Sequence, residues 1–112
     1  MEKPSVDQLV TGYAQDVGDR FSATGSVTLV RAANRNILVD CGDPWNGAEI
    51  LQNLSSFGLQ KEDIHVVAVT HGHIDHCGNL SLFQDAAIYM NNDVASNGTY
   101  TTLPQVPLLY VG

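Results

Sequence analysis

A short apolar run, VVAV at residues 66–69, leads directly into the segment THGHIDHCG at residues 70–78. Three of the chain's four histidines, together with Asp75, fall within six consecutive positions of that segment. Imidazole and carboxylate groups at such density are the ligands that a borderline divalent cation prefers, and zinc is the first choice. Because functional sites of α/β proteins usually lie where strands end, the pattern predicts a metal site at the rim of a sheet.

The spacing within this segment predicts two groups of ligands. His71 and His73 are two residues apart, so in an extended segment both imidazoles point to the same side and can face one ion. Asp75 and His76 follow after a bend and can face a second position close by. Gly78 allows the backbone to turn sharply after the motif.

Strand patterns surround the motif. Residues 26–31 alternate polar and apolar side chains, which is typical of a half-buried strand. An asparagine-rich turn at 33–36 leads into a returning strand at 36–40. Further strands are expected at 8–13, 64–70, 86–90 and 106–111, and a loop is expected at 21–25.

One helix is expected between the second and third of these strands. Asn46 is predicted to cap it, with Glu49 completing a capping box, and Gly58 is predicted to end it. A second, short helix is expected to begin at Asn79. The apolar face of the longer helix consists of Ile50, Leu51, Leu54 and Phe57.

Composition limits the classes of partner. The chain has 112 residues, 44% of them hydrophobic, and five basic residues against twelve acidic ones, for a net charge of -7. So few lysines and arginines argue against a nucleic-acid platform formed by this segment alone. Residues 1–7 lack the apolar core of a secretory signal, and no apolar run approaches the about 20 residues of a membrane span. With two cysteines, a reduced protein of the cytoplasm is expected, with the nucleus left open and no membrane partner.

The segment 70–79 resembles the His-x-His-x-Asp-His signature of the metallo-β-lactamase superfamily. Val39-Asp40-Cys41-Gly42 is similar to the family's earlier Val-Asp-Thr-Gly element, with cysteine in place of the usual threonine. The resemblance extends from about residue 8 to at least residue 90. It implies an α/β fold, the N-terminal half of an αββα sandwich, with residues 1–112 as a single partial domain.

The resemblance also implies a set of metal ligands. His71 and His73 would bind a first metal, and Asp75 and His76 a second. One or two zinc ions are expected, with iron or manganese as alternatives. In the family, two later histidines and a later aspartate complete the sites, but no histidine follows His76 here. Two protein ligands per ion predict weak zinc binding and negligible turnover for the isolated chain.

The implied activity is that of a zinc-dependent hydrolase. Zinc lowers the pKa of a bound water to about 7, and the resulting hydroxide attacks a carbonyl carbon or a phosphorus. Asp75 is the expected catalytic residue, which holds the nucleophile in line or accepts its proton. Asp40 is either a carboxylate that orients an imidazole or an ordinary strand-end cap. Small-molecule esters, thioesters and lactams and nucleic-acid phosphodiesters are all candidate substrates, and the segments 40–45 and 78–83 resemble a branch linked to RNA endonuclease activity.

A second hypothesis is a non-catalytic product, a truncated or spliced half-domain that pairs with another chain. Half a sandwich leaves several hundred Å² of apolar sheet uncovered, which forfeits on the order of 10 kcal/mol of stability. A homodimer through the exposed sheet is the expected consequence.

Three side chains near the motif have alternative interpretations. Trp45 either lines a substrate groove or packs under the following helix, and packing is favoured. Cys77 is either a further metal donor or, as free cysteines more often are, a small buried hydrophobe. His65 belongs to the opposite alternation set from Val66 and Ala68, so an exposed histidine that binds no metal is expected.

Overall fold

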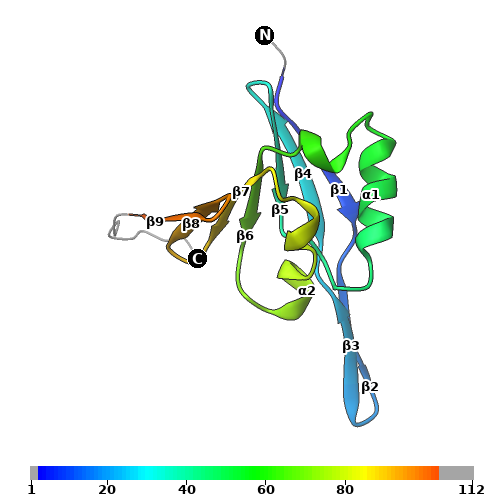
Figure 1. Cartoon of the computed structure of the whole chain (residues 1–112). Helices are drawn as coiled ribbons and strands as arrows, with labels where there is room; N and C mark the ends of the chain where they lie inside the picture. Colours follow the sequence, from blue (N-terminus) through cyan, green and yellow to red (C-terminus); the bar gives the residue numbers. More distant parts are fainter. Residues whose placement is uncertain (1–2, 104–112) are drawn as a thin grey trace.

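The computed structural model describes residues 3–103, which form a seven-stranded mixed sheet and a projecting two-stranded hairpin (Figure 1). The hairpin consists of β2 (Tyr13–Val17) and β3 (Arg20–Thr24). The strands of the sheet, in spatial order, are β1 (Ser5–Val10), β4 (Val27–Ala32), β5 (Arg35–Val39), β6 (Val66–Val69), β7 (Ala87–Met90), β8 (Asp93–Ser96) and β9 (Thr99–Thr102).

Helical segments connect the three parallel strands at the centre. Helix α1 (Gly47–Ser55) and the 3-10 turn η1 (Lys61–Asp63) lie between β5 and β6 in the chain. The short helix α2 (Ile74–Cys77) and the turn η2 (Leu80–Leu82) lie between β6 and β7. Because β5, β6 and β7 pair in parallel, their carboxyl ends meet at one edge of the sheet. The histidine motif follows β6 at this edge.

The hydrophobic core lies between the sheet and α1. Ile50 and Leu54 on the helix are fully buried, as are Leu29, Leu38 and Val67 on three adjacent strands. Each such side chain contributes about 1.5–3 kcal/mol when it leaves water. The apolar helical face predicted from the sequence is therefore confirmed, with Leu51 and Phe57 partly buried beside it.

The opposite face of the sheet is also apolar. The strand registers align Val6, Val30, Ile37, Val66 and Ala87 in one row across five adjacent strands. Each of these side chains is partly buried or exposed, and none belongs to the core cluster or packs against it. The sheet thus has one covered face and one open apolar face among the residues described.

Several turns agree with the sequence prediction, and one loop does not. Ala33 and Asn34 have φ of 53° and 63°, the left-handed pair that a tight hairpin between β4 and β5 requires. Residues 21–25 were expected to be a loop, but most of them form β3, because the pairing of Tyr13 with Thr24 extends the hairpin beyond the main sheet. The strand expected at 8–13 is divided between β1 and β2. A further hairpin, β8–β9, turns at Asn97 and Gly98, and the strand expected at 106–111 lies outside the described residues.

The two predicted asparagine caps are wrong in their hydrogen bonding. Asn46 precedes α1 but makes no side-chain cap, so the capping box with Glu49 is absent. Asn79 precedes η2 and also makes no cap. Its buried amide instead donates to the carbonyl oxygens of Cys41 at 2.7 Å and Asp43 at 2.6 Å. These bonds tie the segment after β5 to the segment after α2. No helix between residues 3 and 103 is long and apolar enough to cross a membrane.

Candidate metal centre

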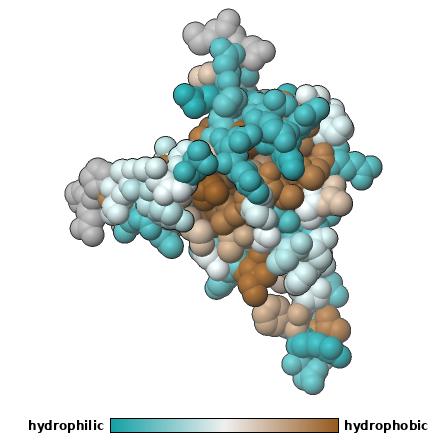
Figure 2. All heavy atoms as spheres, in the orientation of Figure 1, coloured by the Kyte–Doolittle hydropathy of each residue, from teal (hydrophilic) through white to brown (hydrophobic). Residues whose placement is uncertain are grey.

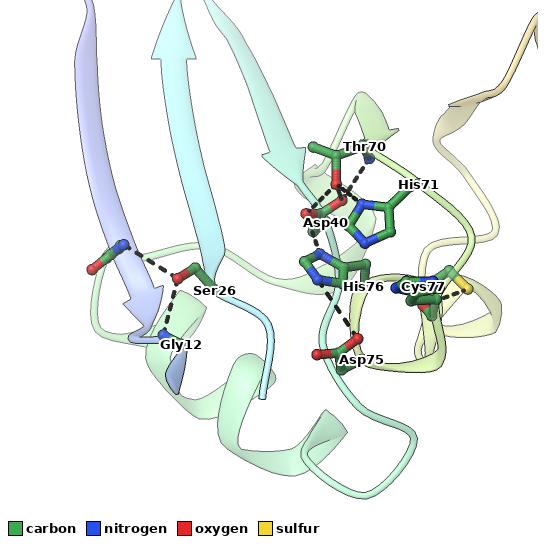
Figure 3. Close-up of polar contacts among 10 residues, drawn as sticks. Gly12, Ser26, Asp40, Thr70, His71, Asp75, His76 and Cys77 are labelled. Atoms are coloured by element: carbon green, nitrogen blue, oxygen red, sulfur yellow. Dashed lines mark hydrogen bonds and ion pairs between the residues drawn. The ribbon is translucent and has the colours of Figure 1, made fainter. Parts of the chain in front are cut away.

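The candidate site lies at the carboxyl ends of β5 and β6 (Figure 3). Asp40 directly follows β5, Thr70 directly follows β6, and Asp75 and His76 lie on α2. The side chains therefore come from two adjacent parallel strands and the short helix after them. This position confirms that the motif lies at the rim of the sheet.

Asp40 is the best-connected polar residue of the site. Its side chain is almost fully buried, with 5% exposed. One carboxylate oxygen accepts the backbone N–H of Thr70 at 2.7 Å, and the other accepts the Thr70 hydroxyl at 2.8 Å. The second oxygen also lies 2.7 Å from Nδ1 of His76. Because a carboxylate oxygen accepts, His76 carries its proton on Nδ1 and leaves Nε2 without one.

Backbone strain accompanies these bonds. Asp40 has φ of 65°, in the left-handed region that aspartate tolerates better than most residues but that still costs energy. Its own N–H donates to the carbonyl of Ala68 at 2.8 Å. The left-handed turn therefore places the carboxylate over the end of β6, where it contacts Thr70 and His76.

The three imidazoles of the motif form one cluster. The ring centroids of His71 and His76 lie 4.1 Å apart, and those of His71 and His73 lie 4.6 Å apart. Nδ1 of His71 is 3.0 Å from the Thr70 hydroxyl. Nε2 of His76 lies 3.6 Å from a carboxylate oxygen of Asp75. The structure thus brings the four predicted ligands, His71, His73, Asp75 and His76, to one place.

Close backbone contacts hold α2 in position. A Cβ atom at Gly25 would lie 2.5 Å from the carbonyl oxygen of Asp75 and 3.0 Å from Cε1 of His76. On the other side, the N–H of Cys41 donates to the carbonyl of His76 at 2.9 Å, and the N–H of Gly78 donates to Gly42 at 2.8 Å. The histidine motif is therefore fixed between the base of the hairpin and the turn after β5.

The donor types fit a divalent cation, whereas the arrangement is not that of a formed coordination sphere. Imidazole and carboxylate are the ligands that zinc, iron and manganese accept. Between residues 3 and 103, however, no group of three or more histidine, cysteine, aspartate or glutamate side chains is placed to hold one ion. Holding an ion would therefore require the side chains of the cluster to rotate from their positions here.

The neighbouring side chains resolve the alternatives left open by the sequence. Trp45 was expected to pack under α1, but it is 78% exposed and lines a groove beside the histidines. Cys77 is partly buried against the core, and its thiol donates to the carbonyl of His73 at 3.3 Å. His65 is exposed, and its Nδ1 accepts the backbone N–H of Asn36 at 2.9 Å. Burial raises the pKa of the Cys41 thiol to about 11, so Cys41 is no metal-binding thiolate near neutral pH.

Sequence reasoning missed two residues of the site. Thr70 bridges Asp40 and His71 through its hydroxyl, and Gly25 leaves room for Asp75 and His76. The position of Thr70, directly before the motif, was the signal available for the first. No local signal marks Gly25, which meets the motif only through the tertiary fold.

An open groove of about 840 Å³ runs past the histidine cluster. One wall is the hairpin strand β3, another is the connection between β5 and α1, and the third is the motif itself. The groove gives a small molecule access to the cluster from solvent. Its lining consists of Phe21, Ala23, Asp43, Trp45, Gly72, His73, Ile74, Asp75 and His76.

Comparison with known proteins agrees with this arrangement. Residues 23–90 match the family model of the metallo-beta-lactamase superfamily. The chain is 45% identical to metallo-beta-lactamase domain-containing protein 1 of Xenopus laevis, over 86% of this chain and 41% of that protein. It is 40% identical to a ribonuclease of Thermus thermophilus, over 61% of this chain and 16% of the relative.

A solved structure supports the fold. A Thermotoga maritima protein of the metallo-beta-lactamase type matches 79% of this chain and 43% of its own length, with a TM-score of 0.68 and 30% identity. The mixed α/β fold expected from the motif is confirmed by this match. The chain spans less than half of the length of this structure and of the Xenopus relative. Because the family model covers residues 23–90, including the whole histidine motif, this chain belongs to the metallo-beta-lactamase superfamily.

Proposed function

We propose that the chain carries the metal-ligating motif of a metal-dependent hydrolase that cleaves an ester, thioester, lactam or phosphodiester bond. The supporting observation is the clustering of His71, His73 and His76, with ring centroids 4.1 and 4.6 Å apart, beside Asp75 at the carboxyl edge of a parallel sheet. Membership of the superfamily and the similarity to a ribonuclease favour a hydrolase.

The proposed roles follow from the position of each side chain. His71 and His73 would hold one ion, and Asp75 and His76 a second, with zinc preferred and iron or manganese as alternatives. A bound divalent ion lowers the pKa of its water to about 7 and so supplies a nucleophile near neutral pH. Asp75 would orient that nucleophile or accept its proton. Asp40 orients His76 through the bond to Nδ1, which leaves Nε2 available as a ligand.

Zinc binding by this chain is expected to be weak. Two protein ligands for each ion are fewer than the about three of a catalytic zinc site and the four of a structural one. Low turnover is expected for the same reason. The net charge of -7 offers little to a polyanion, so the ribonuclease option rests on the similarity alone.

Calorimetric titration of the 112-residue chain with zinc tests the ligand assignment. We expect weak binding that is lost in His71→Ala and His73→Ala. The matched control is His65→Ala, which removes an exposed histidine outside the cluster and should leave zinc binding unchanged. Equal zinc binding by the parent and by His71→Ala would refute the assignment, and a tight two-metal complex would refute the argument from ligand number. A screen of ester, thioester, lactam and phosphodiester substrates then defines the reaction.

A second candidate function, pairing with another chain, is supported by the open apolar face. The row that includes Val30, Ile37 and Val66 presents hydrophobic side chains across adjacent strands without a covering layer in the described part of the chain. We propose a homodimer through this face. Light scattering should show a dimer for the parent and a monomer for Ile37→Lys, with Thr99→Lys on the exposed strand β9 as the control. A monomeric parent that unfolds cooperatively would contradict this candidate.

The compartment is proposed on the state of the cysteines. Both Cys41 and Cys77 are free thiols. A reducing environment, the cytoplasm or the nucleus, keeps thiols in this state.

A further inference from the structure

Three large hydrophobic side chains stand exposed around the groove beside the histidines. Phe21 lies on β3 and is 73% exposed, Trp45 lies between β5 and α1 and is 78% exposed, and Ile74 opens α2 and is 67% exposed. They come from three separate parts of the chain and line one groove with His73 and His76. Figure 2 shows hydrophobic surface on the projecting hairpin and on the part of the molecule just above it.

The convergence of these side chains distinguishes them from scattered surface hydrophobes. Single exposed apolar residues are common and need no explanation, whereas an apolar lining with a few convergent polar groups is typical of a small-molecule site. The groove volume of about 840 Å³ falls within the range of such sites.

The walls of the groove are held in a fixed relation to one another. The Thr24 hydroxyl at the end of β3 donates to the buried carboxylate of Asp43 at 3.1 Å, which joins the hairpin to the turn before Trp45. Gly25 lies directly against Asp75 and His76, which joins the same hairpin to α2. The three apolar side chains therefore project from backbone segments that contact one another.

The charges in the groove argue against a polyanionic occupant. Asp43 and Asp75 line it, and none of the lining side chains is a lysine or arginine among the residues described. Arg20, next to Phe21 on the hairpin, lies 3.9 Å from the carboxylate of Asp19. Metal ions at the histidines would neutralise only the reacting group, and the flanking phosphates of a nucleic acid need further cations.

We infer that the groove selects a substrate with a neutral aromatic group, which binds against Phe21, Trp45 and Ile74 while the scissile bond faces the histidines. This inference rests on the proposed hydrolase function for the position of the scissile bond. Aromatic side chains offer such a group both large apolar contact area and ring stacking. The substrate class favoured is a small aromatic ester, thioester or lactam over a nucleic-acid strand.

Trp45 is the single tryptophan of the chain, so its fluorescence reports on the groove directly. The metal-free chain, kept in a chelator, is titrated with N-benzylacetamide, an unreactive neutral aromatic amide, and in parallel with an oligouridylate. We expect a saturable blue shift of the emission with the amide and none with the oligonucleotide. Phe21→Ser and Ile74→Ser should each weaken binding of the amide about tenfold, which corresponds to about 1.4 kcal/mol.

The control is Tyr100→Ser, which removes an equally exposed aromatic side chain on β9, outside the groove lining. Its affinity for the amide should equal that of the parent. Saturation by the oligouridylate without a response to the amide would overturn the inference, as would no response to either ligand or unchanged affinity in Phe21→Ser and Ile74→Ser. Because no metal and no turnover are involved, this result is separate from the zinc titration that tests the hydrolase.

Discussion

Replacement of Asp40 by asparagine should move the proton of His76 from one ring nitrogen to the other. In the parent, a carboxylate oxygen of Asp40 lies 2.7 Å from Nδ1 of His76 and therefore accepts a proton from it. In Asp40→Asn, the amide oxygen can still accept the N–H of Thr70, which lies 2.7 Å from the present carboxylate. The amide NH₂ then faces His76, and Nδ1 must become the acceptor. The proton is expected on Nε2.

The energetic effect can be estimated from the bonds that change. Asparagine tolerates the φ of 65° at this position, so the backbone contributes little. Hydrogen bonds to a charged group are worth about 1.5–3 kcal/mol and neutral ones about 1 kcal/mol. The exchange of a charged for a neutral acceptor should therefore lower the free energy of unfolding by about 1–2 kcal/mol.

Long-range ¹H–¹⁵N correlation spectra of the histidine rings report the tautomer, and urea unfolding reports the stability. The matched control is Asp63→Asn, at an exposed aspartate whose side chain accepts the backbone N–H of Gln60 and does not touch the motif. It should leave the His76 spectrum unchanged. If His76 keeps its proton on Nδ1 in Asp40→Asn, the role assigned to Asp40 is wrong. A His76 protonated on Nε2 cannot ligate through that atom, so zinc binding should also weaken by about 10–100-fold.

Two further predictions concern the support of the site. Gly25→Ala should lower the free energy of unfolding by about 1–3 kcal/mol and shift the His76 ring resonances, because its Cβ would lie 2.5 Å from the Asp75 carbonyl oxygen; wild-type stability in urea unfolding would show that the contact is absent. Burial raises the pKa of the Cys41 thiol from 9.0 to about 11, so above pH 9 the unfolded chain loses this proton first. Stability should fall by about 3 kcal/mol between pH 9 and 11 in the parent, and a Cys41→Ala variant that shows the same fall would contradict this explanation.

The parts of the fold that sequence reasoning predicted well depend on local patterns. Alternation predicted β4, and the 3.6-residue period predicted the buried face of α1, since side-chain direction along an element depends only on its own geometry. The turn at Ala33 and Asn34 was predicted because asparagine tolerates positive φ. The capping box at Asn46 and the loop at 21–25 were wrong, since both depend on contacts with distant residues.

The site shows the same division. The order of ligand types in residues 71–76 is a property of the sequence, and it was sufficient to predict the superfamily and the place of the motif at the end of a strand. Asp40 could be assigned two roles from sequence, because nothing local states which of its neighbours will approach. The structure decided between them by placing its carboxylate against His76, 36 positions further along the chain.

Sequence by itself determined which metal-binding side chains this protein carries, their spacing and the helix and strand that flank them, because these depend on residue type and on the period of each element. Only the tertiary structure decided the contact of Asp40 with His76, the close approach of Gly25 to α2 and the exposure of Trp45 beside Phe21 and Ile74. These features join segments far apart in the chain. Their geometry is set by the parallel pairing of β5 with β6 and by the projection of the β2–β3 hairpin, and no local pattern encodes either.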